Sequence, residues 1–181
     1  MASKTSIINQ ALILIGESPV TDFTSPVGNI ANSLYETSRD SMLTDHRWRF
    51  AVKKVALVVA STSPVNEWQY WFTLPTDMLL LIRTYPNSSY EVFEDKLATN
   101  SSTVSIDYVF DPGEQKYPEY FVKALAHNLA SDMALAVTND KTLEGIMAAK
   151  AARFVAAATH KDSQGRPSTA IQSRPFIDVR G

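Results

Sequence analysis

Apolar side chains recur every three to four residues in the last third of the chain, the spacing of one face of an α-helix. There are two such series, separated only by Thr138-Asn139-Asp140, and a connection this short predicts two antiparallel helices. The pattern stops after His160, and residues 162–181 contain few apolar groups to bury, which predicts an extended C-terminal arm. The apolar positions are Phe121/Val122, Leu125, Leu129, Met133 and Ala136/Val137 in the first series, and Leu143, Ile146/Met147, Phe154 and Ala157/Ala158 in the second.

The same periodicity predicts two further helices near the N-terminus. Ser3 can cap the first, and Gly16 can end it, because glycine readily adopts the left-handed conformation found after helices. The pair Ser25-Pro26 places a capping hydroxyl before a proline at the first helical position, which predicts the start of the second helix. That helix should end near Asp45 or His46.

Between these helical pairs, short aromatic and β-branched runs are separated by turn residues, a pattern typical of strands. After the β-rich run 52–60, we expect strands at 69–74, 79–84, 90–97 and 103–110, with Asn100-Ser101-Ser102 joining the last two as a hairpin. The predicted fold class is therefore α+β. A bundle of about four main helices carries a small, mainly antiparallel sheet, inserted over about residues 50–110 between the helical pairs. We expect a single domain over residues 1–161 and an arm over 162–181.

Composition narrows the possible functions. The chain has 181 residues, of which 45% are hydrophobic and 20% charged, as in an ordinary globular domain. The net charge of −2 gives no overall basic field for nucleic acid or anionic membrane. There is no cysteine, which excludes disulfides and thiolate sites. No basic segment followed by a long apolar run opens the chain, so we expect neither a signal peptide nor a membrane span.

Candidate catalytic groups are few. His46, His127 and His160 share no metal-ligand spacing, and no cofactor or metal is expected. His127, four residues after Lys123, is most simply a partly buried or interfacial side chain. Glu17 and Asp22 could serve as the carboxylate pair of a cell-wall (peptidoglycan) glycosidase, although two carboxylates are weak support for this chemistry.

Aromatic groups offer a second alternative, a nucleic-acid-binding module. Trp48 with Arg49, and Trp68 with Trp71, could stack on bases. Aromatic residues in strands are more often part of a core or an interface. Since no reactive groups converge, the sequence favours a structural protein over an enzyme.

Several stretches, in order along nearly the whole chain, resemble the head-to-tail adaptor (connector) proteins of short-tailed bacteriophages, the tail tubular protein A family. The resemblance implies a virion protein that forms a ring, typically of twelve copies, beneath the portal. Such a ring extends the DNA channel and provides the docking platform for the tail nozzle. The stretches are residues 8–20 (INQALILIGESPV), 45–51 (DHRWRFA), 72–78 (FTLPTDM) followed by Ile82-Arg83, 108–111 (YVFD) leading into 120–126 (YFVKALA), and 176–180 (FIDVR).

The resemblance also implies partners and locations. The expected partners are the portal protein, the nozzle protein and further copies of the chain, with genomic DNA passing through the lumen without specific binding. The protein would be made in the host cytoplasm and end in the virion at the head–tail junction. For the portal contact we expect the arm residues Arg166, Arg174, Phe176, Ile177, Asp178 and Arg180. For the ring interface we expect the alanine-rich side of the last helix, with Ala148, Ala152, Arg153 and Ala156.

Overall fold

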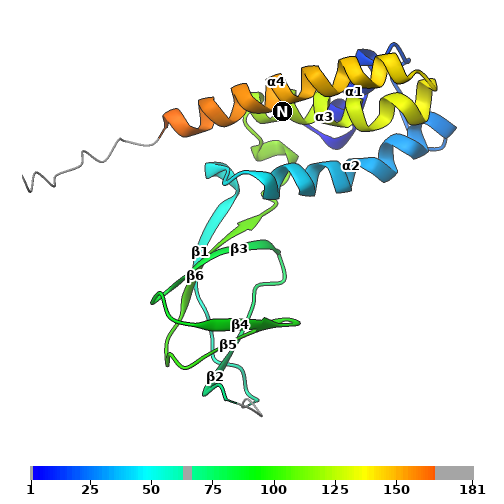
Figure 1. The fold of residues 1–181 in the computed structure, drawn as a ribbon. Coiled ribbons are helices and arrows are strands. Elements are labelled where there is room, and N and C mark those ends of the chain that lie inside the picture. The colour runs from blue at the N-terminus through cyan, green and yellow to red at the C-terminus, as the bar shows by residue number, and fades with distance from the viewer. Residues whose placement is uncertain (1, 63–66, 166–181) are drawn as a thin grey trace, which may run out of the picture.

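The computed structural model describes residues 2–62 and 67–165. Four helices form a body from which a β-region projects, and the strands lie in sequence between the second and third helices (Figure 1). This arrangement confirms the predicted α+β fold. The helices are α1 (Lys4–Leu14), α2 (Pro26–Asp45), α3 (Glu119–Thr138) and α4 (Lys141–Gln164), with short 3₁₀ turns at Arg49–Ala51 and Glu114–Lys116.

The helix boundaries follow local sequence signals. The side-chain oxygens of Ser3 and Ser25 accept backbone N–H groups of the first turns of α1 and α2, as predicted. Gly16 adopts φ +88° just after α1, the conformation for which glycine is suited. Asn139 takes the left-handed conformation between α3 and α4, and the Asp140 carboxylate caps α4. These two residues account for the tight reversal of the hairpin.

Helix α3 occupies the centre of the helical body and packs against α1, α2 and α4. Its buried positions recur on more than one face, because three helices surround it. Trp48, Tyr35 and Phe121 are among the largest side chains in this core, and each is fully buried. The buried residues of α3 are Phe121, Val122, Ala124, Leu125, Ala126, His127, Leu129, Ala130, Met133 and Ala134.

The β-region consists of two three-stranded antiparallel sheets where the sequence predicted one. The first has the order β1-β6-β3, and the second has the order β2-β5-β4. A second hydrophobic core, which includes Phe72, Leu97 and Ile106, lies among these strands. The strands are β1 (Val52–Ala56), β2 (Tyr70–Thr73), β3 (Met78–Tyr85), β4 (Tyr90–Phe93), β5 (Lys96–Thr99) and β6 (Ser105–Phe110).

The predicted strand 90–97 is wrong, because it contains a reversal. β4 and β5 pair as an antiparallel hairpin, and the chain reverses direction at Glu94 and Asp95. The turn contains no glycine or proline that could have revealed it in the sequence. Glu94 instead adopts the positive φ, 54°, that the reversal needs. The hairpin predicted at Asn100-Ser101-Ser102 is also wrong, because β5 and β6 belong to different sheets.

Helix α4 continues to Gln164, beyond the end expected at His160. Residues 162–164 of the predicted arm are therefore helical. The last turn is polar, so apolar periodicity could not reveal it. Asp162 within this turn is nevertheless buried, and its carboxylate is held by hydrogen bonds from two other elements.

Candidate functional site

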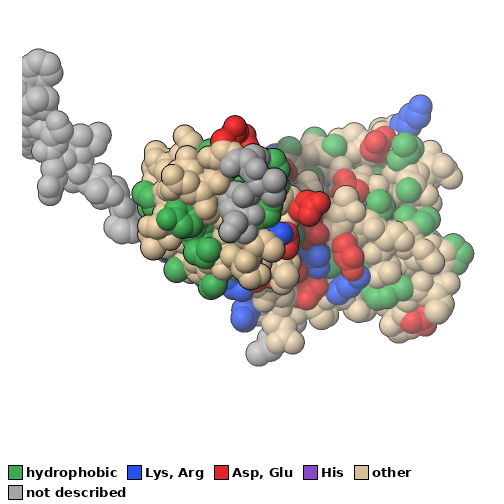
Figure 2. All heavy atoms as spheres, turned by 90° about the horizontal axis from the view of Figure 1, so that it is seen from below, with side chains coloured by type: hydrophobic (Ala, Val, Ile, Leu, Met, Phe, Trp, Pro, Cys, Tyr) green, Lys and Arg blue, Asp and Glu red, His purple; other side chains and the backbone are tan. Residues whose placement is uncertain are grey.

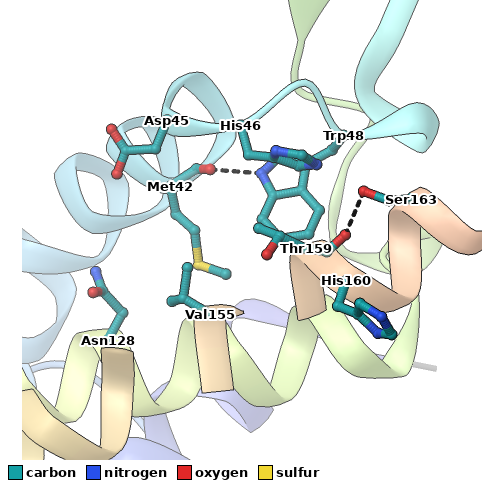
Figure 3. A pocket seen from close by; sticks show the side chains of 9 residues that line it. All are labelled: Met42, Asp45, His46, Trp48, Asn128, Val155, Thr159, His160 and Ser163. Carbon is teal, nitrogen blue, oxygen red and sulfur yellow. Dashed lines mark hydrogen bonds between the residues drawn. The ribbon is translucent and has the colours of Figure 1, made fainter. Parts of the chain in front are cut away.

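A pocket of about 400 Å³ lies where the end of α2 meets α3 and α4 (Figure 3). Helix α2 and the segment after it supply one side, and α4 supplies the other. Trp48, Met42 and Val155 provide apolar surface. The full lining is Met42, Asp45, His46, Trp48, Asn128, Val155, Thr159, His160 and Ser163.

Most polar groups of this Trp48 pocket are already hydrogen-bonded to the protein. The Trp48 indole Nε1 donates to the Met42 carbonyl oxygen at 2.7 Å. The Ser163 hydroxyl donates to the Thr159 carbonyl oxygen at 2.8 Å, and the Thr159 hydroxyl donates to the Ala156 carbonyl oxygen at 2.9 Å. Both hydroxyl groups donate their protons to backbone carbonyl oxygens of α4. Neither is therefore hydrogen-bonded to a basic side chain that could activate it as a nucleophile.

Asp162, near the end of α4, is hydrogen-bonded to α3 and to the first 3₁₀ turn. Its buried carboxylate accepts the Arg49 backbone N–H at 3.2 Å and the Tyr120 hydroxyl at 2.7 Å. The His46 Nε2 atom lies 3.8 Å from the same carboxylate. Burial and the adjacent Asp162 charge raise the pKa of Tyr120. This carboxylate therefore stabilises the junction between the helical body and the start of the β-region.

His127 lies on α3 and stacks on Phe154 of α4, with ring centroids 3.9 Å apart. Its Nδ1 atom is buried without a hydrogen-bond partner among the described residues. Burial, together with the positive charges of Lys123 and Lys150, lowers the pKa of His127. Apolar grooves of about 450 and 460 Å³ lie on either side of this histidine, one beside α1 and the other beside α4. His127 is 7% exposed, and is thus buried more completely than the sequence-based interpretation of a partly buried or interfacial side chain.

The predicted ring-interface residues share one surface of α4. Ala148, Ala152, Arg153 and Ala156 are all exposed, whereas Ala151 and Ala158 of the same helix are buried against the body. The structure therefore leaves this alanine-rich face open to solvent. The predicted portal-binding residues Arg166, Arg174, Phe176, Ile177, Asp178 and Arg180 lie outside the described residues.

The proposed glycosidase pair has no supporting geometry. Asp22 is exposed, and its carboxylate accepts hydrogen bonds from the backbone N–H and hydroxyl of Thr24. These bonds lower the pKa of Asp22 and keep it ionised, so Asp22 does not suit the role of general acid, although it could be the ionised partner of one. Neither Glu17 nor Asp22 lines the pockets described above.

The aromatic groups considered for base stacking are largely committed to the protein. Trp48 is fully buried in the helical core. Trp68 is half-buried and donates its indole N–H to Glu91 at 3.1 Å. Trp71 is also half-buried, with its Nε1 atom enclosed. Trp48 is therefore not available to stack on a base, whereas Trp68 and Trp71 are partly exposed.

A charged cluster on the β1-β6-β3 sheet was not predicted from the sequence. The buried Asp107 carboxylate of β6 is contacted by Arg47 at 3.1 Å, Arg83 at 2.8 Å and Lys54 at 3.7 Å. One signal was available, a carboxylate within the apolar run Ser105–Phe110, since a buried charge needs a partner. The identity of the partners depends on strand register, which the sequence pattern does not give.

Large apolar side chains also reach the surface of the β-region. β4 is an edge strand in which all four residues are exposed, including Tyr90, Val92 and Phe93. Viewed from below, hydrophobic side chains are visible on the surface of the molecule (Figure 2). Where such side chains form a large contiguous patch, they mark interaction sites in soluble proteins. The other exposed large apolar residues of this region are Val55, Val58, Val59, Leu79, Leu80 and Tyr85.

Two further classes of site are absent from the described ranges 2–62 and 67–165. No three potential metal-ligating side chains come together in them. None of the helices in these ranges combines the length and apolar character needed to cross a bilayer.

No protein-family model matches the chain, and no curated protein matches it.

Proposed function

We propose that this chain is a head-to-tail adaptor of a short-tailed bacteriophage, a structural virion protein and not an enzyme. Its copies form a ring, typically of twelve, beneath the portal, extend the DNA channel and present a docking platform for the tail nozzle. The proposal begins from the ordered sequence resemblance. The structural observation that supports it best is the presence of two separate exposed surfaces, on α4 and on the projecting β-region.

The α4 surface suits close contact with a neighbouring copy. Small side chains at Ala148, Ala152 and Ala156 permit close backbone approach, and Gly145 also has open space around it. A closed ring requires heterologous contacts, in which one face of a subunit meets a different face of the next. The outer face of α2 can provide that second face, because α3 lies between α2 and α4 (Figure 1).

Charge supports this pairing of faces. Lys150 and Arg153 are exposed on α4 and form no ion pair with the described residues. Glu36 and Asp40 lie one turn apart on the outer face of α2, with side chains 66% and 39% exposed, and they pair with Lys4 and Arg39 of their own subunit. The unpaired cations of α4 against these α2 carboxylates favour one orientation of neighbouring subunits.

The other contacts follow from the same assignment. The exposed apolar residues of the β-region provide a platform for the nozzle protein. The arm, with Phe176, Ile177 and its arginines, binds the portal, where apolar anchors fill pockets and guanidinium groups pair with carboxylates. Repetition around the ring multiplies the strength of each small contact. The protein is made in the host cytoplasm and ends at the head–tail junction.

Electron microscopy of the protein mixed with the portal of the same phage tests this function. Coaxially stacked rings are the expected result, and persistent monomers that ignore the portal would contradict the proposal. A chain truncated after Gly165 keeps Asp162 and the whole of α4, so loss of docking would be assigned to the arm alone. If this truncated chain docks as well as the full chain, the arm is not the portal contact.

A further inference from the structure

Three cationic side chains surround one carboxylate on an open face of the β1-β6-β3 sheet. Lys54 of β1 and Arg83 of β3 are the cross-strand partners of Asp107, which lies on the central strand β6. Arg47 reaches the same carboxylate from the segment that follows α2. All three cations contact the same oxygen, Oδ2.

The cluster carries more positive charge than its carboxylate can neutralise. Asp107 is 1% exposed, whereas the side chains of Arg47, Arg83 and Lys54 are 33%, 46% and 68% exposed. Among the described residues, Asp107 is the one carboxylate within ion-pair distance of these three cations. Two positive charges are therefore uncompensated and in contact with solvent.

Both guanidinium groups keep N–H donors for a ligand. Arg47 uses one terminal nitrogen, Nη2, and Arg83 uses Nε, in their hydrogen bonds to Asp107. Their remaining N–H groups make no hydrogen bond to the described residues. A planar fork of such donors matches the geometry of an oxyanion, especially a phosphate.

An aromatic ring lies one row further along the same face. Tyr85 is two residues beyond Arg83 on β3, so the two side chains share a face and lie about 7 Å apart along the strand. The Arg83 guanidinium carbon is 4.7 Å from the centre of the Tyr85 ring, which is 42% exposed. A pocket of about 470 Å³ adjoins this ring and includes Ser105, the cross-strand partner of Tyr85.

We propose that this face binds an unpaired nucleic-acid strand, with Arg47, Lys54 and Arg83 on a backbone phosphate and Tyr85 stacking on the adjacent base. Cations beside an exposed aromatic ring are the combination that single-strand-binding surfaces use. An acidic protein segment could satisfy the cations but would leave the ring and pocket unexplained. The site lies within one subunit, so it does not depend on ring assembly or on the portal.

Fluorescence anisotropy of the full-length protein with a labelled oligothymidine tests the proposal. Lys54→Gln should weaken binding several-fold and reduce the salt-dependence slope by about 0.7, the value for one lost phosphate contact on a single strand. Asp107 and both arginines keep their contacts in this variant, so the sheet should remain folded. Lys53→Gln is the matched control, since Lys53 is next in the strand but faces the other way and pairs with Asp77. This control should bind like the natural chain.

Two further variants separate the phosphate contact from the base contact. Asp107→Asn removes the competing negative charge and should tighten binding, provided that circular dichroism shows a folded chain. Tyr85→Ala should weaken binding to the single strand, whereas Tyr85→Phe should retain it.

Four outcomes would overturn the proposal. Equal affinity of Lys54→Gln and Lys53→Gln would exclude the cationic cluster. Duplex binding as tight as single-strand binding, unaffected by Tyr85→Ala, would exclude base stacking. Displacement of the oligonucleotide by an equal concentration of inorganic phosphate would mean that only an ion binds. More effective displacement by polyglutamate would assign the face to an acidic protein.

Discussion

Trp48 connects the helical body to the β-region through contacts of a single side chain. Its indole is fully buried, and its N–H donates to the Met42 carbonyl oxygen at the end of α2. Its ring lies 5.0 Å from that of Phe121 on α3, in an edge-to-face arrangement. The chain enters the first 3₁₀ turn and β1 directly after this residue. Trp48 therefore determines how the β-region leaves the helices.

Truncation of Trp48 should be severe. We expect Trp48→Ala to lower the free energy of unfolding by about 3–5 kcal/mol, because a large cavity replaces a buried ring. Trp48→Phe should cost less, about 1–3 kcal/mol, mainly because the Met42 carbonyl loses its donor. Urea unfolding followed by far-UV circular dichroism measures both. Trp68→Phe, at a half-buried position, is the control, and an effect as large as that of Trp48→Ala would contradict this assignment.

His127 should make stability depend on pH. Its pKa is lowered in the folded chain by burial and by Lys123 and Lys150, so between the folded and unfolded pKa values the unfolded chain binds more protons. Stability should therefore fall as pH drops below about 6.5, the ordinary histidine value. His127→Phe keeps a ring against Phe154 and should remove this part of the slope. The difference in unfolding free energy between the two chains should therefore change between pH 7.5 and pH 5, and a constant difference would show that the folded chain binds the proton as readily as the unfolded chain.

At the scale of elements, the helices were predictable and the strand pairing was not. Helix ends carry local signals such as Ser25 and Gly16, which act within one turn of the chain. Strand pairing joins residues far apart in sequence, and a reversal such as Glu94-Asp95 leaves no glycine or proline to mark it. The exposed face of α4 could be predicted from the periodicity of its sequence. The cluster of cations around Asp107 could not, because its members are brought together by the register of three strands.

The last turn of α4 provides a prediction at this scale. Asp162→Ala removes the acceptor for the Tyr120 hydroxyl and the Arg49 N–H, so it should destabilise the chain by about 1–3 kcal/mol. Hydrogen exchange should show faster opening of both the last turn of α4 and the first 3₁₀ turn. Ser163→Ala is the neighbouring control, since its exposed hydroxyl serves only the helix backbone, and a change below about 0.5 kcal/mol is expected. Equal effects of the two substitutions would show that Asp162 does not join these elements.

At the scale of the whole molecule, the opposed charges of α2 and α4 predict which faces meet in the proposed ring. Lys150→Glu with Arg153→Glu makes both faces negative, and Glu36→Lys with Asp40→Lys makes both positive. Each double variant alone should remain monomeric, because like charges then meet at every contact. The two α2 carboxylates each lose one ion pair, with Lys4 and Arg39, and solvent-exposed pairs contribute only about 0–1 kcal/mol, so both variants should still fold.

Mixing the two double variants should restore assembly, because each negative α4 face then meets a positive α2 face and each positive α4 face meets a negative one. The product is a ring of alternating subunits, which closes only for an even number of copies and is therefore compatible with twelve. The quadruple variant, with both faces exchanged, should assemble alone. Light scattering at two salt concentrations and electron microscopy measure these outcomes. Assembly of either double variant alone, or failure of the mixture, would place the subunit contact on other surfaces.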